Sequence, residues 1–95
     1  MLEKKVTIKN SQGLHARPAT QFVKVAAKFQ SQIFLSRDGR EADGKSLMNV
    51  IALAAPKGCE LILKIDGVDE QKAMTSLVKL INNKFNIIET NDEKK

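Results

Sequence analysis

The residues whose types and spacing could carry chemistry lie between positions 13 and 20, in the run Gly-Leu-His-Ala-Arg-Pro-Ala-Thr. His15 is the one histidine of the chain, and it falls where a polar turn meets the expected start of a helix. At such a start the first backbone N–H groups lack carbonyl partners and the helix dipole is positive. That field favours a neutral imidazole with a ring nitrogen free to attack, and the same N–H groups can hold an anion.

Two neighbours of His15 strengthen this interpretation. Arg17 adds a fixed positive charge whose planar fork suits phosphoryl oxygens, and Gly13 permits a tight backbone path close to the ring. The run therefore predicts a nucleophile beside an anion-binding helix start, able to accept a phosphoryl group and pass it on. The plainer interpretation is that His15 is a cap or a solvated residue, Arg17 an exposed cation and Pro18 a helix initiator. From the residue spacing alone, the plainer interpretation is favoured over the functional one.

Hydrophobic periodicity indicates the elements that must position this run. Apolar and polar residues alternate over 2–9, 32–37 and 61–66, which is typical of strands buried on one face, and Asp38-Gly39 predicts a hairpin turn into a return strand at 40–43. Helical spacing predicts a helix with Pro18 in its opening turn, a second over 47–54 capped by Ser46, and a last one capped by Asp69. The order β-α-β-β-α-β-α predicts an α+β domain of two layers, with the helices gathered on one face of the sheet.

The pattern of the helix over 47–54 is apolar nearly all round, with Asn49 as its one polar residue. A two-layer domain covers a helix on one side only, so the other side needs a partner. We therefore expect an exposed docking patch on this helix, while Val50 and Leu53 point inward. The patch consists of Leu47, Met48 and Ile51. The alternative is that the helix is sunk between its neighbours.

Composition excludes several classes of function. The chain has 95 residues and a formal charge of +5, but its cations are scattered among acids and it has no Tyr or Trp, which disfavours nucleic-acid binding and favours an acidic protein partner. No apolar run is long enough for a membrane span, and the N-terminus lacks the apolar stretch of a signal peptide. Cys59 stands alone, so neither an internal disulfide nor a multi-cysteine metal site is expected. We expect a small, reduced, cytoplasmic domain with its site on the surface.

Two segments carry a resemblance to a known family. The stretch from Gly13 to Ala19 resembles the active-site motif of the HPr family, the histidine phosphocarriers of the bacterial phosphoenolpyruvate:sugar phosphotransferase system. The stretch from Gly44 to Val50 is similar to the regulatory serine segment of that family. Length and element order also agree, so the resemblance covers residues 1–88, and residues 89–95 are expected to be a frayed tail.

The resemblance implies an open-faced β-sandwich, a four-stranded antiparallel sheet with three helices on one face. It implies that His15 takes phosphate on Nδ1 from phosphorylated enzyme I and delivers it to IIA domains of sugar permeases. Arg17 and the backbone N–H groups of Ala16 and Arg17 would steady the phosphoryl group. No cofactor or metal, no membrane insertion and a monomer are expected. The partner-binding surface would combine residues of two helices: Ala16, Thr20, Gln21 and Lys24 on the first, Leu47, Met48 and Ile51 on the second.

Ser46 has two interpretations. From the residues alone, Ser46 is expected to be the N-cap of the second helix. The resemblance implies instead that an ATP-dependent HPr kinase/phosphorylase phosphorylates Ser46, and that the added charge interferes with binding at the docking surface. A regulator of catabolite repression is a further implied partner. Gln12 and Asn49 depart from the family, which usually has a small polar residue and a glycine there. The rival functions are a regulatory relative of the same fold without sugar transport and, from another class, a basic nucleic-acid-binding module.

Overall fold

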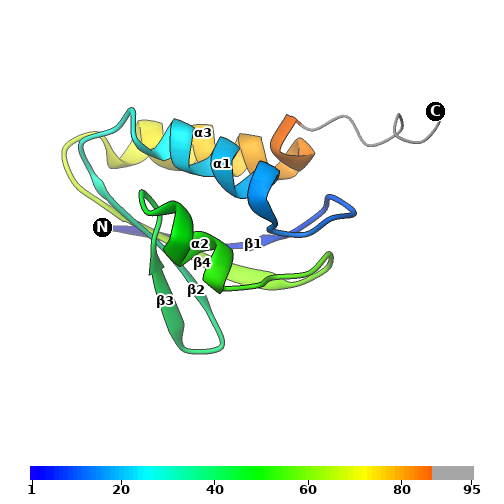
Figure 1. Ribbon diagram of the computed structural model, residues 1–95. Coiled ribbons are helices and arrows are strands. Elements are labelled where there is room, and N and C mark those ends of the chain that lie inside the picture. Colours follow the sequence, from blue (N-terminus) through cyan, green and yellow to red (C-terminus); the bar gives the residue numbers. More distant parts are fainter. Residues whose placement is uncertain (87–95) are drawn as a thin grey trace.

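The computed structural model describes residues 1–86 (Figure 1). The expected frayed tail at 89–95 and the last two residues of the expected 1–88 domain lie outside that range. The elements follow the predicted order, and a short turn over 84–86 comes after the last helix. Their bounds are β1 Leu2–Thr7, α1 Ala16–Ala26, β2 Gln32–Arg37, β3 Arg40–Asp43, α2 Leu47–Ala52, β4 Glu60–Asp66 and α3 Glu70–Asn82.

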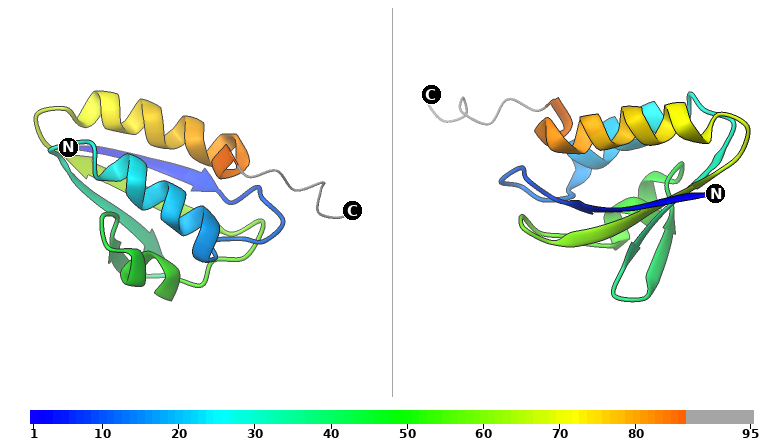
Figure 2. Two further views of the ribbon diagram at one scale, coloured as in Figure 1. Left: turned by 45° about the horizontal axis from the view of Figure 1, so that its top comes forward. Right: turned by 180° about the vertical axis from the view of Figure 1, so that it is seen from behind.

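The four strands form one antiparallel sheet in the order β1-β4-β2-β3, so the strand latest in the sequence lies between β1 and β2. Alternate residues of the central strand β4 are fully buried, namely Leu61, Leu63 and Ile65, while those between them face away from the core. The helices lie over the same face (Figure 2). This arrangement confirms the two-layer domain that the alternating strands predicted and the open-faced sandwich that the resemblance implied.

The three helices do not cover the sheet equally. α1 and α3 run side by side over it, whereas α2 packs against α1 and β3 near one edge (Figure 1). The core between helices and sheet includes Phe22 of α1 and Leu77 of α3, both fully buried. Phe85 also enters this core, because the turn over 84–86 takes positive φ angles at all three residues. The sequence analysis did not predict this turn.

α2 ends earlier than predicted. The periodicity indicated a helix as far as about Ala54, but the helix stops at Ala52, Leu53 is its C-cap, and Ala54 takes a left-handed conformation with φ of +50°. Because a left-handed residue cannot continue a right-handed helix, the chain turns here toward β4.

Asp69 occupies the predicted N-cap position of α3, but its carboxylate does not cap that helix. It accepts hydrogen bonds from the backbone N–H groups of Gln30 and Ser31, both at 2.9 Å, and from the Ser31 hydroxyl at 2.5 Å. The side chain therefore joins the loop after α1 to the loop before α3. These loops approach so closely that a Cβ on Gly67 would lie 2.5 Å from the Ser31 Cα.

The hydrogen bonds to Asp69 give the fold a pH dependence whose sign can be checked. The Ser31 hydroxyl, followed by the Gln30 N–H group, holds the pKa of this carboxyl below its ordinary value of 3.8. A carboxyl with a depressed folded-state pKa stabilises the fold fully above its unfolded pKa, and this contribution is lost as pH falls through the folded pKa. Asp69→Asn should therefore lower the melting temperature by several degrees at pH 7, and the difference from wild type should shrink below about pH 4.

Thermal unfolding followed by circular dichroism at pH 7, 5 and 3 measures both effects. Asp38→Asn is the matched control, because Asp38 is 89% exposed and its carboxylate lies 3.8 Å from the Arg37 Nε. If the difference in melting temperature between Asp69→Asn and wild type stays constant with pH, this account is wrong.

Candidate functional site

His15 is the N-cap residue of α1, with an extended backbone (φ −91°, ψ −171°). Its carbonyl accepts the first helical hydrogen bond, from the Ala19 N–H at 2.8 Å, while its side chain makes no capping bond. The residue is exposed. The imidazole thus stands at the positive end of a helix of 11 residues with its ring open to a partner, as the sequence predicted.

The turn before His15 is held by a reciprocal pair of hydrogen bonds. The buried Asn10 side chain donates from Nδ2 to the Gly13 carbonyl at 2.7 Å, and the Gly13 N–H donates to the Asn10 carbonyl at 3.1 Å. The sequence analysis treated Asn10 only as part of a polar turn. An asparagine two residues after an apolar strand residue gives no sign by itself that it will be buried.

The same turn is pressed against the segment that follows α2. The Leu14 N–H donates to the Ala55 carbonyl at 2.7 Å, and Leu14 itself is buried. Gly13 has φ of +72°, and a Cβ there would lie 2.5 Å from the Ala55 oxygen and 2.9 Å from the Pro56 Cα. Only glycine fits this approach, so the contact fixes the backbone immediately before His15.

The start of α1 can receive an anion. Within residues 1–86 the N–H groups of Ala16 and Arg17 have no acceptor, Pro18 has no N–H, and the first turn contains no acidic residue. The Arg17 side chain is exposed and makes no ion pair with any other described residue. The two residues after His15 therefore offer two backbone donors and one guanidinium to an anion, and both residues line a hollow together with His15.

Two adjoining hollows border the ring. One is lined by residues of the β1–α1 turn, by Ile51 at the end of α2 and by residues 54–57, and the other by Gln12, Ala16 and Arg17. Gln12 and His15 line both, so the residue that departs from the family pattern lies directly at the site. The views in Figure 2 show the loop after β1, the start of α1 and the loop after α2 gathered at one end of the molecule. The sequence analysis did not predict that residues 54–57 would line the site.

The predicted docking residues of α2 divide as expected, with one correction. Met48 is 74% exposed and Leu47 is 37% exposed, whereas Val50 and Leu53 are buried. Ile51 was expected to be exposed, but it is half-buried and packs against the core, so only part of its side chain faces solvent.

On α1, the four predicted partner-binding residues also differ in exposure. Ala16 and Lys24 are exposed, while Thr20 and Gln21 are half-buried. The Thr20 hydroxyl donates to the Ala16 carbonyl at 2.7 Å, so it supports the first turn of the helix. Because α1 packs against α2, the residues of the two helices lie on neighbouring elements.

Ser46 is the N-cap of α2, which confirms its structural interpretation. Its Oγ accepts the Asn49 N–H at 3.4 Å, and its own N–H donates to the Asp43 carbonyl at 3.0 Å. The Asn49 side chain, at the position where the family usually has glycine, accepts the Asp43 N–H at 3.5 Å. Asn49 therefore ties the start of α2 back to the end of β3.

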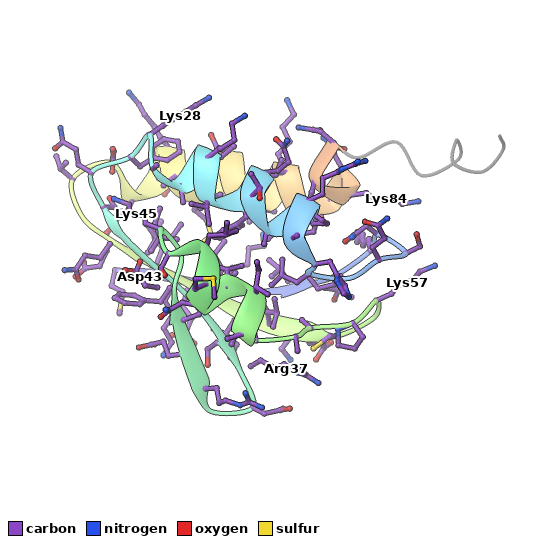
Figure 3. All side chains as sticks on the ribbon, in the orientation of Figure 1. Lys28, Arg37, Asp43, Lys45, Lys57 and Lys84 are labelled. Atoms are coloured by element: carbon purple, nitrogen blue, oxygen red, sulfur yellow. The ribbon has the colours of Figure 1, made fainter. Side chains whose placement is uncertain are left out.

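Ser46 and His15 lie at opposite ends of α2. Ser46 begins the helix, whereas the residues that line the hollow of His15 follow its end. A helix of 6 residues spans about 9 Å, which places a separating element between the two side chains. Lys45, next to Ser46 and labelled in Figure 3, instead reaches the loop after α1. Its Nζ donates to the Phe29 carbonyl at 2.6 Å.

Across residues 1–86 no helix has the length and apolar character that a membrane span requires. Within the same residues, His, Cys, Asp and Glu do not come together in groups of three or more that could bind a metal ion.

Comparisons with known proteins agree with this geometry. Residues 2–83 match the family model described as the PTS HPr component phosphorylation site. Phosphocarrier protein HPr of Cupriavidus necator is 47% identical over 85 residues, which cover 90% of this chain and 96% of that protein. The crystal structure of HPr from Thermoanaerobacter tengcongensis superposes with a TM-score of 0.89 at 42% identity, covering 93% of this chain and 99% of that chain.

A third relative has a different description. Crh of Bacillus subtilis, a catabolite repression protein whose crystal structure is a swapped dimer, is 38% identical with a TM-score of 0.71 and covers 88% of this chain and 97% of its own. The match of the family model over most of the chain, together with the identity to phosphocarriers, settles the family. The chain belongs to the HPr phosphocarrier family of the phosphotransferase system.

Proposed function

We propose that this protein accepts a phosphoryl group on His15 from phosphorylated enzyme I and passes it to IIA domains of sugar permeases. The observation that carries the proposal is the exposed imidazole at the N-cap of α1 beside two backbone N–H groups that lack acceptors within residues 1–86. Family membership supports the choice of donor and acceptor proteins. The cytoplasm, which we expect from the lone Cys59, is the proposed compartment.

The proposed transfer is a displacement at phosphorus. A ring nitrogen of His15, taken as Nδ1 from the resemblance, forms a bond to phosphorus while the bond to the donor protein breaks. Negative charge on the three phosphoryl oxygens is met by the N–H groups of Ala16 and Arg17 and by the Arg17 guanidinium. A monomer is the proposed working form. Transfer to an IIA domain is the same displacement in the other direction.

Removal of the imidazole tests the proposal directly. Wild-type protein mixed with enzyme I and phosphoenolpyruvate should acquire phosphate that is labile in acid and stable in base. His15→Ala should acquire none, since the chain contains no other histidine. Phosphate incorporation measured with labelled phosphoenolpyruvate, and circular dichroism to show that the variant is folded, make up the experiment. Wild-type protein that takes no label, or a variant that does, would refute the phosphocarrier function.

The partner-binding surface is proposed to include Leu47, Met48 and Ile51 of α2 with Ala16, Thr20, Gln21 and Lys24 of α1. Its support is the exposure of Met48, an apolar side chain that no neighbouring element covers within the described residues. Truncating a central apolar contact weakens association, and a loss of about tenfold corresponds to ~1.4 kcal/mol.

Met48→Ser should therefore raise the KM of enzyme I for this protein by up to about tenfold, with little change in kcat. Val68→Ser is the matched control, because Val68 is also an exposed apolar residue, at 86%, but lies in the loop before α3. Steady-state kinetics with each variant as the phosphoryl acceptor give both constants. Equal KM values for the two variants would show that Met48 is not part of the partner-binding surface.

Ser46 is proposed as a regulatory phosphorylation site for an ATP-dependent HPr kinase/phosphorylase, and a regulator of catabolite repression is a proposed partner of the modified form. The exposed Leu47 and Met48 follow Ser46 directly, so a phosphate there would place about −1.5 to −2 charges at the edge of the docking patch. The fold should tolerate this charge, because it sits at the start of a helix.

Ser46→Asp imitates part of that charge while keeping a residue type suited to the N-cap. It should slow phosphorylation of His15 by enzyme I several-fold and leave the melting temperature nearly unchanged. Thr75→Asp, which adds the same charge on an exposed position of α3, should leave the rate as in wild type. Initial rates with labelled phosphoenolpyruvate decide the matter, and an unchanged rate in Ser46→Asp rules out the proposed mechanism.

A regulatory role without sugar transport is the second candidate. The similarity to Crh, a catabolite repression protein, is the observation that favours it. The two functions differ in the step after His15. A regulator need not pass phosphate to a permease, so transfer from the labelled protein to purified IIA domains discriminates between them.

A further inference from the structure

Arg37, at the end of β2, makes contacts that none of the motifs in the sequence indicated. Its Nη1 donates to the Leu53 carbonyl at 2.8 Å and to the Ala54 carbonyl at 3.0 Å. The side chain is 28% exposed, and its Nε lies 3.8 Å from the nearest Asp38 carboxylate oxygen. Figure 3 shows Arg37 beneath the end of α2, with Lys57 at the tip of the loop that follows.

The Leu53 carbonyl, at the C-cap of α2, is one that a helix leaves without a partner at its C-terminal end, and the Ala54 carbonyl follows it directly. Leu53 is the C-cap of α2, and Ala54 has the left-handed φ of +50°. A cation at this end of a helix is favourable, and two hydrogen bonds to consecutive carbonyls fix the orientation of both peptide groups. Arg37 therefore holds the chain at the point where it leaves α2.

The next residue along the chain contacts the turn of His15. The Ala55 carbonyl accepts the Leu14 N–H at 2.7 Å, and Gly13 fits against Ala55 and Pro56 with no space for a Cβ. Ala54, Ala55 and Pro56 also line the hollow that His15 borders. Arg37 is thus linked to the backbone of His15 through two successive sets of hydrogen bonds.

We propose that Arg37 is a positioning residue for His15. By binding the carbonyls of Leu53 and Ala54 it places Ala55, and Ala55 in turn places the backbone from which the imidazole projects. Arg37 touches no reacting atom, so it acts only through this geometry. The effect on phosphoryl transfer rests on the proposed function, whereas the effect on the Leu14 hydrogen bond does not.

Three variants separate positioning from general stability. Arg37→Met keeps the length and apolar stem but has no donor, and Arg37→Lys keeps the charge and can reach a carbonyl with a single ammonium. Arg40→Met is the matched control, because Arg40 begins the neighbouring strand β3, is exposed, and has no hydrogen bond or ion pair to a side chain or helix end within residues 1–86.

Two measurements are made on each variant under conditions in which it is folded. Amide hydrogen exchange compares the Leu14 N–H, which binds Ala55, with the Ile8 N–H, which binds the Cys59 carbonyl at 2.9 Å. In Arg37→Met the Leu14 amide should exchange about tenfold faster while the Ile8 amide stays as in wild type, since only the local contact opens. Phosphorylation by enzyme I should show a kcat lowered about tenfold with KM nearly unchanged, because the docking surface is intact.

Arg37→Lys should give intermediate values in both measurements, and Arg40→Met should match wild type. Wild-type Leu14 exchange in folded Arg37→Met overturns the proposal, and so does equal acceleration of the Leu14 and Ile8 amides, which would show a role in overall stability only. If Arg37→Met does not fold, the exchange rates of the Leu14 and Ile8 amides in Arg37→Lys test the proposal in the same way. Wild-type protein that takes no phosphate would refute the proposed function, and the exchange result would still decide the role of Arg37.

Discussion

The close contact between residues 13–14 and residues 55–56 is the constraint on which the site depends. It brings the turn after β1 against the segment after α2, two parts of the chain about forty positions apart, through one hydrogen bond of 2.7 Å and a glycine with no space for a side chain. Leu14 is buried by this contact while His15, the next residue, is exposed. The backbone that carries His15 is therefore held in place by the core, while the imidazole itself is exposed and accessible to a partner.

The electrostatics of the site suit a group that is held briefly. Two backbone N–H groups, one guanidinium and the positive end of α1 surround the ring, and no acidic residue occupies the first turn. This arrangement favours a phosphoryl group without enclosing it, because the hollows beside His15 are partly open to solvent. A protein that must both receive and release the same group gains from contacts that are small and quickly broken.

Much of this fold follows from local sequence patterns. Alternation in residues 2–9, 32–37 and 61–66 predicted the strands, Asp38-Gly39 predicted the hairpin, and Ser46 predicted a helix start, because each signal depends on neighbours within a few positions. The position of His15 at a helix start was likewise readable from the residues around it.

The features that could not be predicted depend on partners distant in sequence. The Asp69 carboxylate caps no helix because tertiary packing brings it to Gln30 and Ser31, nearly forty positions earlier. Asn10, Phe85 and the wall formed by residues 54–57 likewise have roles set by what packs against them. Ile51 was expected to be exposed with its neighbours, but it is half-buried and packs against the core. Periodicity gives the side of an element a residue occupies, not how deeply that side is covered.

The placement of Ser46 and His15 at opposite ends of α2 has a consequence for how signals combine. A helix separates the two side chains, so we expect coupling between them to arise chiefly in the complex with a partner that touches both ends of α2. If both residues are phosphorylated as proposed, a partner that spans α2 would contact both phosphates, and different partners could respond differently to the same two modifications.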